Sequence, residues 1–221
     1  MNSNRFARLG LLLAALCGAL ASAKERKPSL QIDSPADGTV VNPGQTITVS
    51  VSSPSGVSFK AVAVLAENPL GITELANSVP TRFSIAIPSN ISCRRYMLTA
   101  HGVTTTGQSV DSKSLGLDVE RPDTPVSIES SQFPSLTLEA KDPRFHLIIL
   151  ATFSDRSEID VTESSYLTYQ SSNTDVATVE GYAGIKAVGP GTASITVTYK
   201  NPTGASVQLS VRVTVSSKKP S

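Results

Sequence analysis

The sequence predicts an all-β protein built of two β-sandwich domains in tandem. Three observations predict this class. Short runs that alternate apolar and polar residues recur along residues 28–216, as expected of half-buried strands. Gly, Pro, Asn and Asp separate these runs at spacings of roughly 8–12 residues, which is typical of sandwiches. No segment of a dozen residues in this region has the periodicity of a helix.

Residues 1–23 have the pattern of a secretory signal peptide. Arg5 and Arg8 give a positive start, residues 9–20 form an apolar run, and Ala21-Ser22-Ala23 is a small-x-small cleavage site. The apolar run is short for a bilayer core of roughly 30 Å, so we expect cleavage rather than anchoring. Cys17 is not preceded by a small residue, which argues against lipid attachment there. The expected location is the periplasm, the cell surface or the exterior.

Residues 28–120 are expected to form the first sandwich. The run Thr46–Ser52 alternates cleanly and would place its isoleucine and two valines on a core-facing side. Asn42-Pro43-Gly44 has the residues of a turn, because Pro fixes φ and Gly accepts positive φ. The expected strands are 30–33, 46–52, 58–67, 81–87, 95–103 and 109–119.

Residues 121–125 are expected to be a short, semi-rigid linker, because the two prolines and three charges of Glu120–Pro125 separate two strands. Residues 126–216 would form the second sandwich, followed by a solvated tail at 217–221. Gly189-Pro190-Gly191 predicts a sharp turn between two of its strands. The expected strands are 126–130, 135–139, 146–153, 167–171, 177–180, 185–188, 192–199 and 206–215.

The second half resembles the bacterial immunoglobulin-like domain, group 2, over residues 126–215. Five segments carry the resemblance by their order and spacing: Ala151–Asp155, Ile159–Thr162, Tyr169–Asp175, Val176–Val179 and Ile185–Val197. Tyr169 stands where the family often has Trp, and a buried Tyr there would need a hydrogen-bond partner. The resemblance implies an immunoglobulin-like sandwich, often in a surface or adhesive setting. The matching residues build the scaffold, so no binding site is carried over.

The first half resembles another bacterial immunoglobulin-like or fibronectin-type module. The resemblance rests on the turn segments Asp33–Gly38 and Asn42–Gln45. Tyr96 opens an expected strand and could form the tyrosine corner of such sandwiches, in which the hydroxyl bonds a backbone carbonyl a few residues upstream.

Charge and cysteine content narrow the range of partners. Without residues 1–23 the chain has 17 basic and 18 acidic residues, which gives no electrostatic reason to bind nucleic acid or an anionic membrane. No later run is long and apolar enough for stable membrane insertion. Cys93 would be the single cysteine of the exported chain, so an internal disulfide is excluded. It is either buried or paired between chains, and burial is favoured.

No catalytic residues and no cofactor are expected, and the chain is predicted not to be an enzyme. The only two histidines, His101 and His146, fall in different halves, whereas a triad or a metal cluster needs convergent ligands. The sequence also lacks a nucleophile elbow, a phosphate-binding loop and a dinucleotide fingerprint.

The densest acidic stretch gives a weak candidate for calcium. It comprises Asp155, Glu158, Asp160 and Glu163. Calcium takes six to eight oxygen ligands, but this stretch lacks the spacing and the glycine of an EF-hand, and an arginine interrupts it. The alternative is a solvated loop before a strand, and no metal is expected.

These features predict a non-catalytic exported protein that is a binding or adhesion-type module of the cell envelope or exterior. Its partner would be another envelope or surface protein, or a glycan, bound by loops at the sandwich ends or by an exposed strand edge. The alternative is a structural spacer or an accessory subunit of an envelope complex. A carbohydrate-binding module is less favoured, because six Phe, five Tyr and no Trp leave few aromatics for a sugar platform.

Overall fold

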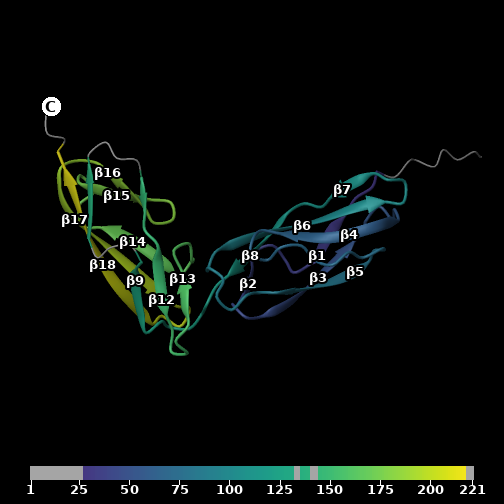
Figure 1. The fold of residues 1–221 in the computed structure, drawn as a ribbon, viewed down its shortest axis with the longest axis horizontal. Coiled ribbons are helices and arrows are strands. Elements are labelled where there is room, and N and C mark those ends of the chain that lie inside the picture. The colour runs from purple at the N-terminus through teal and green to yellow at the C-terminus, as the bar shows by residue number, and fades with distance from the viewer. Residues whose placement is uncertain (1–26, 132–134, 140–143, 218–221) are drawn as a thin grey trace, which may run out of the picture.

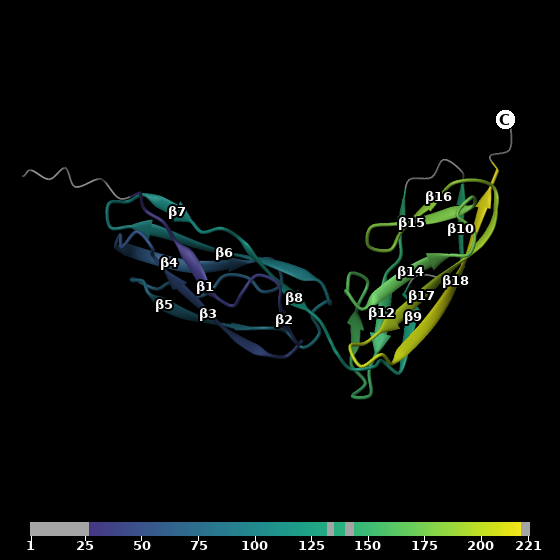
Figure 2. The ribbon, with the colours of Figure 1, turned by 180° about the vertical axis from the view of Figure 1, so that it is seen from behind.

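The computed structural model describes residues 27–131, 135–139 and 144–217, and the fold below is that of these residues. Within them every regular element is a strand, and the strands form two sandwiches placed end to end with a bend between them (Figures 1 and 2). No helix in the described part could cross a membrane. The predicted signal peptide, residues 1–23, and residues 218–221 of the predicted tail lie outside the described residues.

The first sandwich consists of two sheets. One has the order β1-β3-β5, and the other has the order β2-β8-β6-β4, with β7 paired to β6. All pairs are antiparallel except β2 with β8, which is parallel. The strands are β1 Gln31–Ser34, β2 Thr39–Val41, β3 Thr46–Ser52, β4 Phe59–Ala66, β5 Thr81–Ala86, β6 Arg95–Thr104, β7 Ser109–Asp111 and β8 Leu115–Val119.

In the second sandwich the strands divide among three sheets. Its sheets have the orders β10-β18-β17-β14, β13-β12-β9 and β11-β16-β15. An early strand again pairs in parallel with the last one, here β10 with β18. The strands are β9 Ser127–Ser130, β10 Ser135–Glu139, β11 Phe145–His146, β12 Ile149–Thr152, β13 Glu158–Asp160, β14 Leu167–Ser171, β15 Ala177–Glu180, β16 Gly184–Ala187, β17 Gly191–Lys200 and β18 Ser206–Ser216.

Each sandwich has its own apolar core. In the first, Val49, Val51 and Leu98 are fully buried, as the alternation of β3 predicts. In the second, the rings of Phe153 and Tyr199 meet edge to face with centroids 6.4 Å apart. The predicted class, all-β with two immunoglobulin-like sandwiches in tandem, is confirmed.

Two predicted strands are interrupted in the structure. The run 146–153 divides into β11 and β12, which join different sheets. The run 109–119 breaks at Ser112, whose N–H donates to the Ala100 carbonyl while its Oγ accepts from the Ala100 N–H. The short strands β2 and β13 were not predicted, because three residues are too few for alternation to be recognised.

Two predicted local features are present. The Tyr96 hydroxyl donates to the Ser92 carbonyl at 3.1 Å, four residues upstream, so the tyrosine corner is formed. The Gly189–Gly191 turn carries the chain from β16 in one sheet to β17 in another. Gly191 has φ of +146°, and a Cβ on it would lie 2.8 Å from a methyl group of Val176, so glycine is required there.

Candidate functional site

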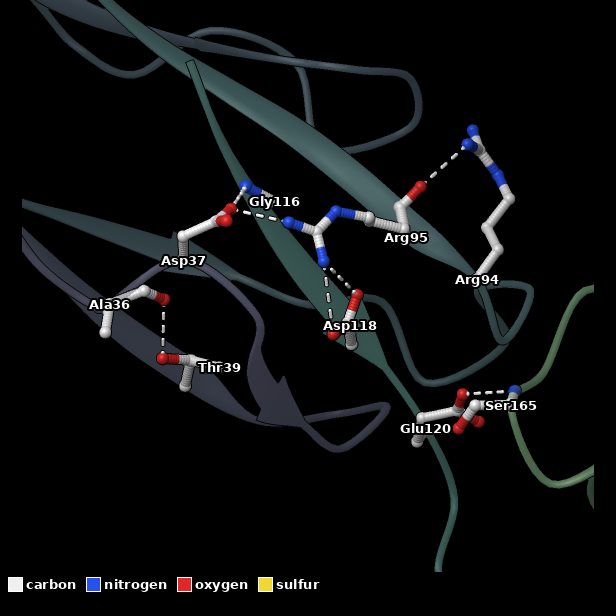
Figure 3. A network of polar contacts seen from close by, with 9 residues as sticks. All are labelled: Ala36, Asp37, Thr39, Arg94, Arg95, Gly116, Asp118, Glu120 and Ser165. Carbon is white, nitrogen blue, oxygen red and sulfur yellow. Dashed lines mark hydrogen bonds and ion pairs between the residues drawn. The ribbon is translucent and has the colours of Figure 1, made fainter. Parts of the chain in front are cut away.

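The junction between the sandwiches is held by a buried carboxylate. Glu120 directly follows β8 and is only 3% exposed. It accepts hydrogen bonds from the Ser164 hydroxyl at 2.5 Å and from the Ser165 N–H at 2.7 Å, the second of which is drawn in Figure 3. A buried charge needs such donors, because water no longer solvates it. The end of the first sandwich is therefore attached to a turn of the second.

Arg121 adds a second set of contacts at the same junction. Its guanidinium donates to Asp155 at 2.8 Å, to Ser157 at 2.6 Å and to Asp123 at 3.1 Å. It also lies 4.2 Å from the centre of the Phe153 ring, in a cation–π contact. Hydrogen bonds from Ser157 and then from Arg121 hold the pKa of Asp155 well below its usual range. The Asp155 carboxylate is therefore charged near neutral pH, where it pairs with Arg121.

The linker itself is bonded to the second sandwich. The Tyr199 hydroxyl donates to the backbone carbonyl of Arg121, and the Asn201 amide donates to the Thr124 hydroxyl at 2.8 Å. Burial raises the pKa of Tyr199, so the hydroxyl keeps the proton that it donates. We call the contacts of Glu120 and Arg121, together with these two bonds, the clasp.

Cys93, which precedes β6 of the first sandwich, packs at the junction. It is 1% exposed, and it packs in the core cluster of the second sandwich rather than in that of its own. Its N–H donates to the Asp160 carbonyl at 2.8 Å. Burial raises the pKa of the thiol to about 12, so the group is a neutral thiol in the folded protein. The expectation that Cys93 is buried is confirmed, whereas its neighbours in the second sandwich were not predicted.

Two hollows of about 520 and 300 Å³ open at the junction, and both sandwiches line each of them. From the first sandwich, the larger hollow is lined by Asn42, Pro43, Ser89 and Asn90. From the linker and the second sandwich it is lined by Arg121, Pro122, Asp123, Asp155, Ser157 and Glu158. From the first sandwich, the smaller hollow is lined by Ser92, Cys93 and Arg94. From the second sandwich it is lined by His146, Leu147, Ile148, Asp160, Thr162, Glu163 and Tyr182.

The four weak calcium candidates are not brought together. Asp155 and Glu158 line the larger hollow, whereas Asp160 and Glu163 line the smaller one. Asp155 is paired with Arg121, and Asp160 accepts both hydrogen bonds offered by Thr162. In the described part of the chain, no group of three or more His, Cys, Asp and Glu could hold a metal ion.

The two histidines do not share a site. His101, on β6, is hydrogen-bonded through Nδ1 to Asp111 at 2.5 Å on the exposed face of the first sandwich. His146, on β11, lies beside the smaller hollow of the junction. Tyr169 has the hydrogen-bond partner that its position requires, since its hydroxyl donates to the Thr162 carbonyl at 2.9 Å.

A row of exposed apolar side chains lies on one face of the first sandwich. Nine large apolar side chains are exposed in the described residues, and four of them, Leu65, Ile72, Leu75 and Met97, are called the apolar row below. Leu75 directly precedes Ala76, which bridges the buried Val62 of β4, so extended backbone there places Leu75 on the outward face, as Ile72 is. Leu65 forms a β-bridge with Ile72. Met97 lies diagonally across from Leu65, because β4 and β6 pair Leu65 with Thr99. The sequence did not reveal this row, because residues 67–80 contain no alternating run.

A polar network borders the apolar row on the same sheet. Arg95 donates to Asp37 at 2.5 Å and to Asp118 at 3.1 Å (Figure 3). Its side chain crosses Gly116, where a Cβ would lie 2.0 Å from the arginine Nε. A backbone hydrogen bond from Gly116 and the charge of Arg95 lower the pKa of Asp37. These contacts tie β6 and β8 to the turn before β2 and brace this face.

Comparison with known proteins finds likeness in fold alone. No family model matches the chain, and no curated protein matches it. Fibronectin(III)-like modules of Clostridium thermocellum CbhA are 21% identical, covering 41% of this chain and 93% of theirs, with a TM-score of 0.35. Extracellular domains 3–5 of Drosophila OTK are 12% identical over 85% of this chain and 66% of theirs, with a TM-score of 0.38. The D00-D0 domain of intimin is 12% identical over 86% of this chain and all of its own, with a TM-score of 0.34.

Proposed function

We propose that this chain is a non-catalytic, exported binding protein of the adhesion type, acting in the cell envelope or outside the cell. The observation that carries the proposal is the apolar row on the first sandwich. Monomeric proteins seldom gather large apolar side chains on one exposed face unless a partner covers them. Ile72 and Leu75 are 71% and 76% exposed, the two highest values among large apolar residues of the described chain.

The partner that suits this face is another envelope or surface protein. Burying a fully exposed Ile or Leu side chain stabilises a complex by about 1.5–3 kcal/mol, so the apolar row can anchor a protein surface. A glycan is the weaker choice, because sugar sites use exposed aromatic rings and the row has none. In this proposal the second sandwich belongs to the bacterial immunoglobulin-like group 2, supported by its five segments and by the bonded Tyr169 hydroxyl.

Affinity capture from an envelope extract tests the binding function. The purified chain is compared with Ile72→Ser/Leu75→Ser and with a matched control, Val126→Ser/Val188→Ser, which removes two exposed apolar side chains elsewhere. We expect the first double variant to lose a specific protein that the wild type and the control both retain. Identical captures by all three chains would contradict the proposal.

The clasp favours a second candidate function, that of a spacer or an accessory subunit that holds a fixed bend. Its contacts join the end of the first sandwich, at Glu120, and the linker, at Arg121 and Thr124, to the second sandwich. Small-angle X-ray scattering of the wild type should fit a single bent conformation. Glu120→Ala/Arg121→Ala should broaden the distribution of sizes, because the side-chain contacts of Glu120 and Arg121 are removed from the clasp. A wild type as broadly distributed as this variant would exclude the spacer function.

A further inference from the structure

The segment Gly71–Ala76 forms the outer edge of the larger sheet of the first sandwich. The Ala66 N–H donates to the Gly71 carbonyl at 2.8 Å, and the Thr73 N–H donates to the Val64 carbonyl at 3.0 Å. Further along, Ala76 and Val62 exchange two hydrogen bonds of 2.8 Å. The segment therefore pairs with β4 on one side, and no strand of the described chain pairs with its other side.

Ile72 presents its backbone outward from this edge. The bonds on either side of it use the Gly71 carbonyl and the Thr73 N–H, so Ile72 is the non-bonded residue of its bridge with Leu65. In such a pair the N–H and C=O of the residue point away from the partner strand. Neither group of Ile72 has a hydrogen-bond partner in the described part of the protein. An edge with free donors and acceptors is a template for another strand.

A bulge limits how much of the edge is available. Three steps along β4, from Val62 to Leu65, oppose four steps along the edge, from Ile72 to Ala76. The extra residue lies at Thr73, whose hydroxyl accepts the Val64 N–H at 2.9 Å. Bulges bend a strand and interrupt its pairing. The edge thus offers a short docking segment around Ile72 rather than a long ladder.

The side chains around Ile72 indicate what the added strand carries. The apolar row lies on one face of the sheet and would contact alternate apolar side chains of that strand. Glu74 is exposed and forms no ion pair within the described residues, whereas Glu67 is already paired with Arg94 at 3.2 Å. Lys60, the basic residue of β4, is near the opposite end of that strand from Leu65. A basic side chain beside Glu74 therefore complements the edge.

We propose that the edge around Ile72 accepts an extended segment of the partner protein as an added strand, with alternating apolar residues and a basic residue beside Glu74. This inference rests on the proposed binding function and specifies its mode. Main-chain hydrogen bonds to Ile72 supply affinity, while the apolar row and Glu74 select the sequence.

Amide hydrogen exchange by NMR on the ¹⁵N-labelled chain tests this mode. The probe is a blocked hexapeptide, Val-Lys-Val-Thr-Val-Lys, and its counterpart has glutamate in place of both lysines. We expect the basic probe at saturation to slow exchange of the Ile72 amide at least about tenfold, and the acidic probe to bind at least about tenfold more weakly. Glu74→Lys should reverse this preference, while Glu129→Lys, which makes the same charge change on the second sandwich, should preserve it.

Strand addition would be overturned if both probes bind equally, or if the Ile72 amide is not protected. It would also be overturned if Glu129→Lys reverses the preference for the basic probe, as Glu74→Lys does. The failure of strand addition can be distinguished from the failure of the proposed binding function. If affinity capture still depends on Ile72 and Leu75 while the Ile72 amide stays unprotected, the apolar row binds a partner through side chains alone.

Discussion

Cys93 is a residue whose burial depends on both sandwiches. Its side chain belongs to the first sandwich in sequence and to the core of the second in space. The thiol pKa is about 12 in the folded chain, against an ordinary value of 9.0. Desolvation is the main cause, followed by the negative charge of Glu120. The protonation of this one group therefore reports on whether the junction is closed.

The stability of the protein should fall as the pH rises above 9. Below that value both the folded and unfolded states keep the Cys93 proton, so the contribution is constant. Between pH 9 and the folded pKa the unfolded state loses the proton first, and unfolding becomes easier by about 1.4 kcal/mol per pH unit. Urea unfolding at pH 8 to 10 measures this, and Cys93→Ala should reduce the slope. The remaining slope comes from buried tyrosines such as Tyr169 and Tyr199, whose pKa burial also raises. An equal slope in wild type and variant would show that the Cys93 thiol is not the buried neutral group described above.

At the scale of elements, the strands that the sequence predicts well are those with one buried face. β3, β17 and β18 alternate over seven to eleven residues, and their bounds agree closely with prediction. The sequence did not predict the edge segment Gly71–Ala76. It pairs with β4 at only two bridges, and its bulge interrupts the alternation of apolar and polar residues.

The junction could not be predicted for a different reason. Glu120 and Arg121 have the composition of an ordinary charged linker, and nothing local distinguishes a solvated carboxylate from a buried one. Their partners, such as Ser164 and Asp155, lie 44 and 34 residues away in sequence. Only the docking of two complete sandwiches brings these groups together, so the site depends on tertiary structure.

The turn between β16 and β17 gives a test at the same scale. Gly191→Ala should destabilise the second sandwich by about 1–3 kcal/mol, because the residue has positive φ and its Cβ would collide with Val176. Gly204→Ala is the matched control, since its φ is +91° but its Cβ would meet open space. Thermal unfolding should show the larger loss for Gly191→Ala. Equal losses would mean that the contact with Val176 does not matter.

At the scale of the whole molecule, the clasp and the apolar row have complementary roles. The clasp holds the two sandwiches end to end with a bend (Figure 1). Both hollows of the junction combine residues of the two sandwiches, so their shape depends on that arrangement. The apolar row lies on the first sandwich, on a sheet that the Arg95 network braces. We infer that the first sandwich makes the main contact and that the second fixes its position.

Site-specific photo-crosslinking in the producing cell tests whether the apolar row is the face that binds a partner. A photoreactive residue replaces Ile72 or Leu75 in the apolar row, and Val126 or Val188 in control chains, all four being exposed apolar positions. We expect one discrete adduct of the same mass from both row positions and none from the controls. Adducts of the same kind from all four positions, or none from the row, would contradict a partner-binding face on the first sandwich.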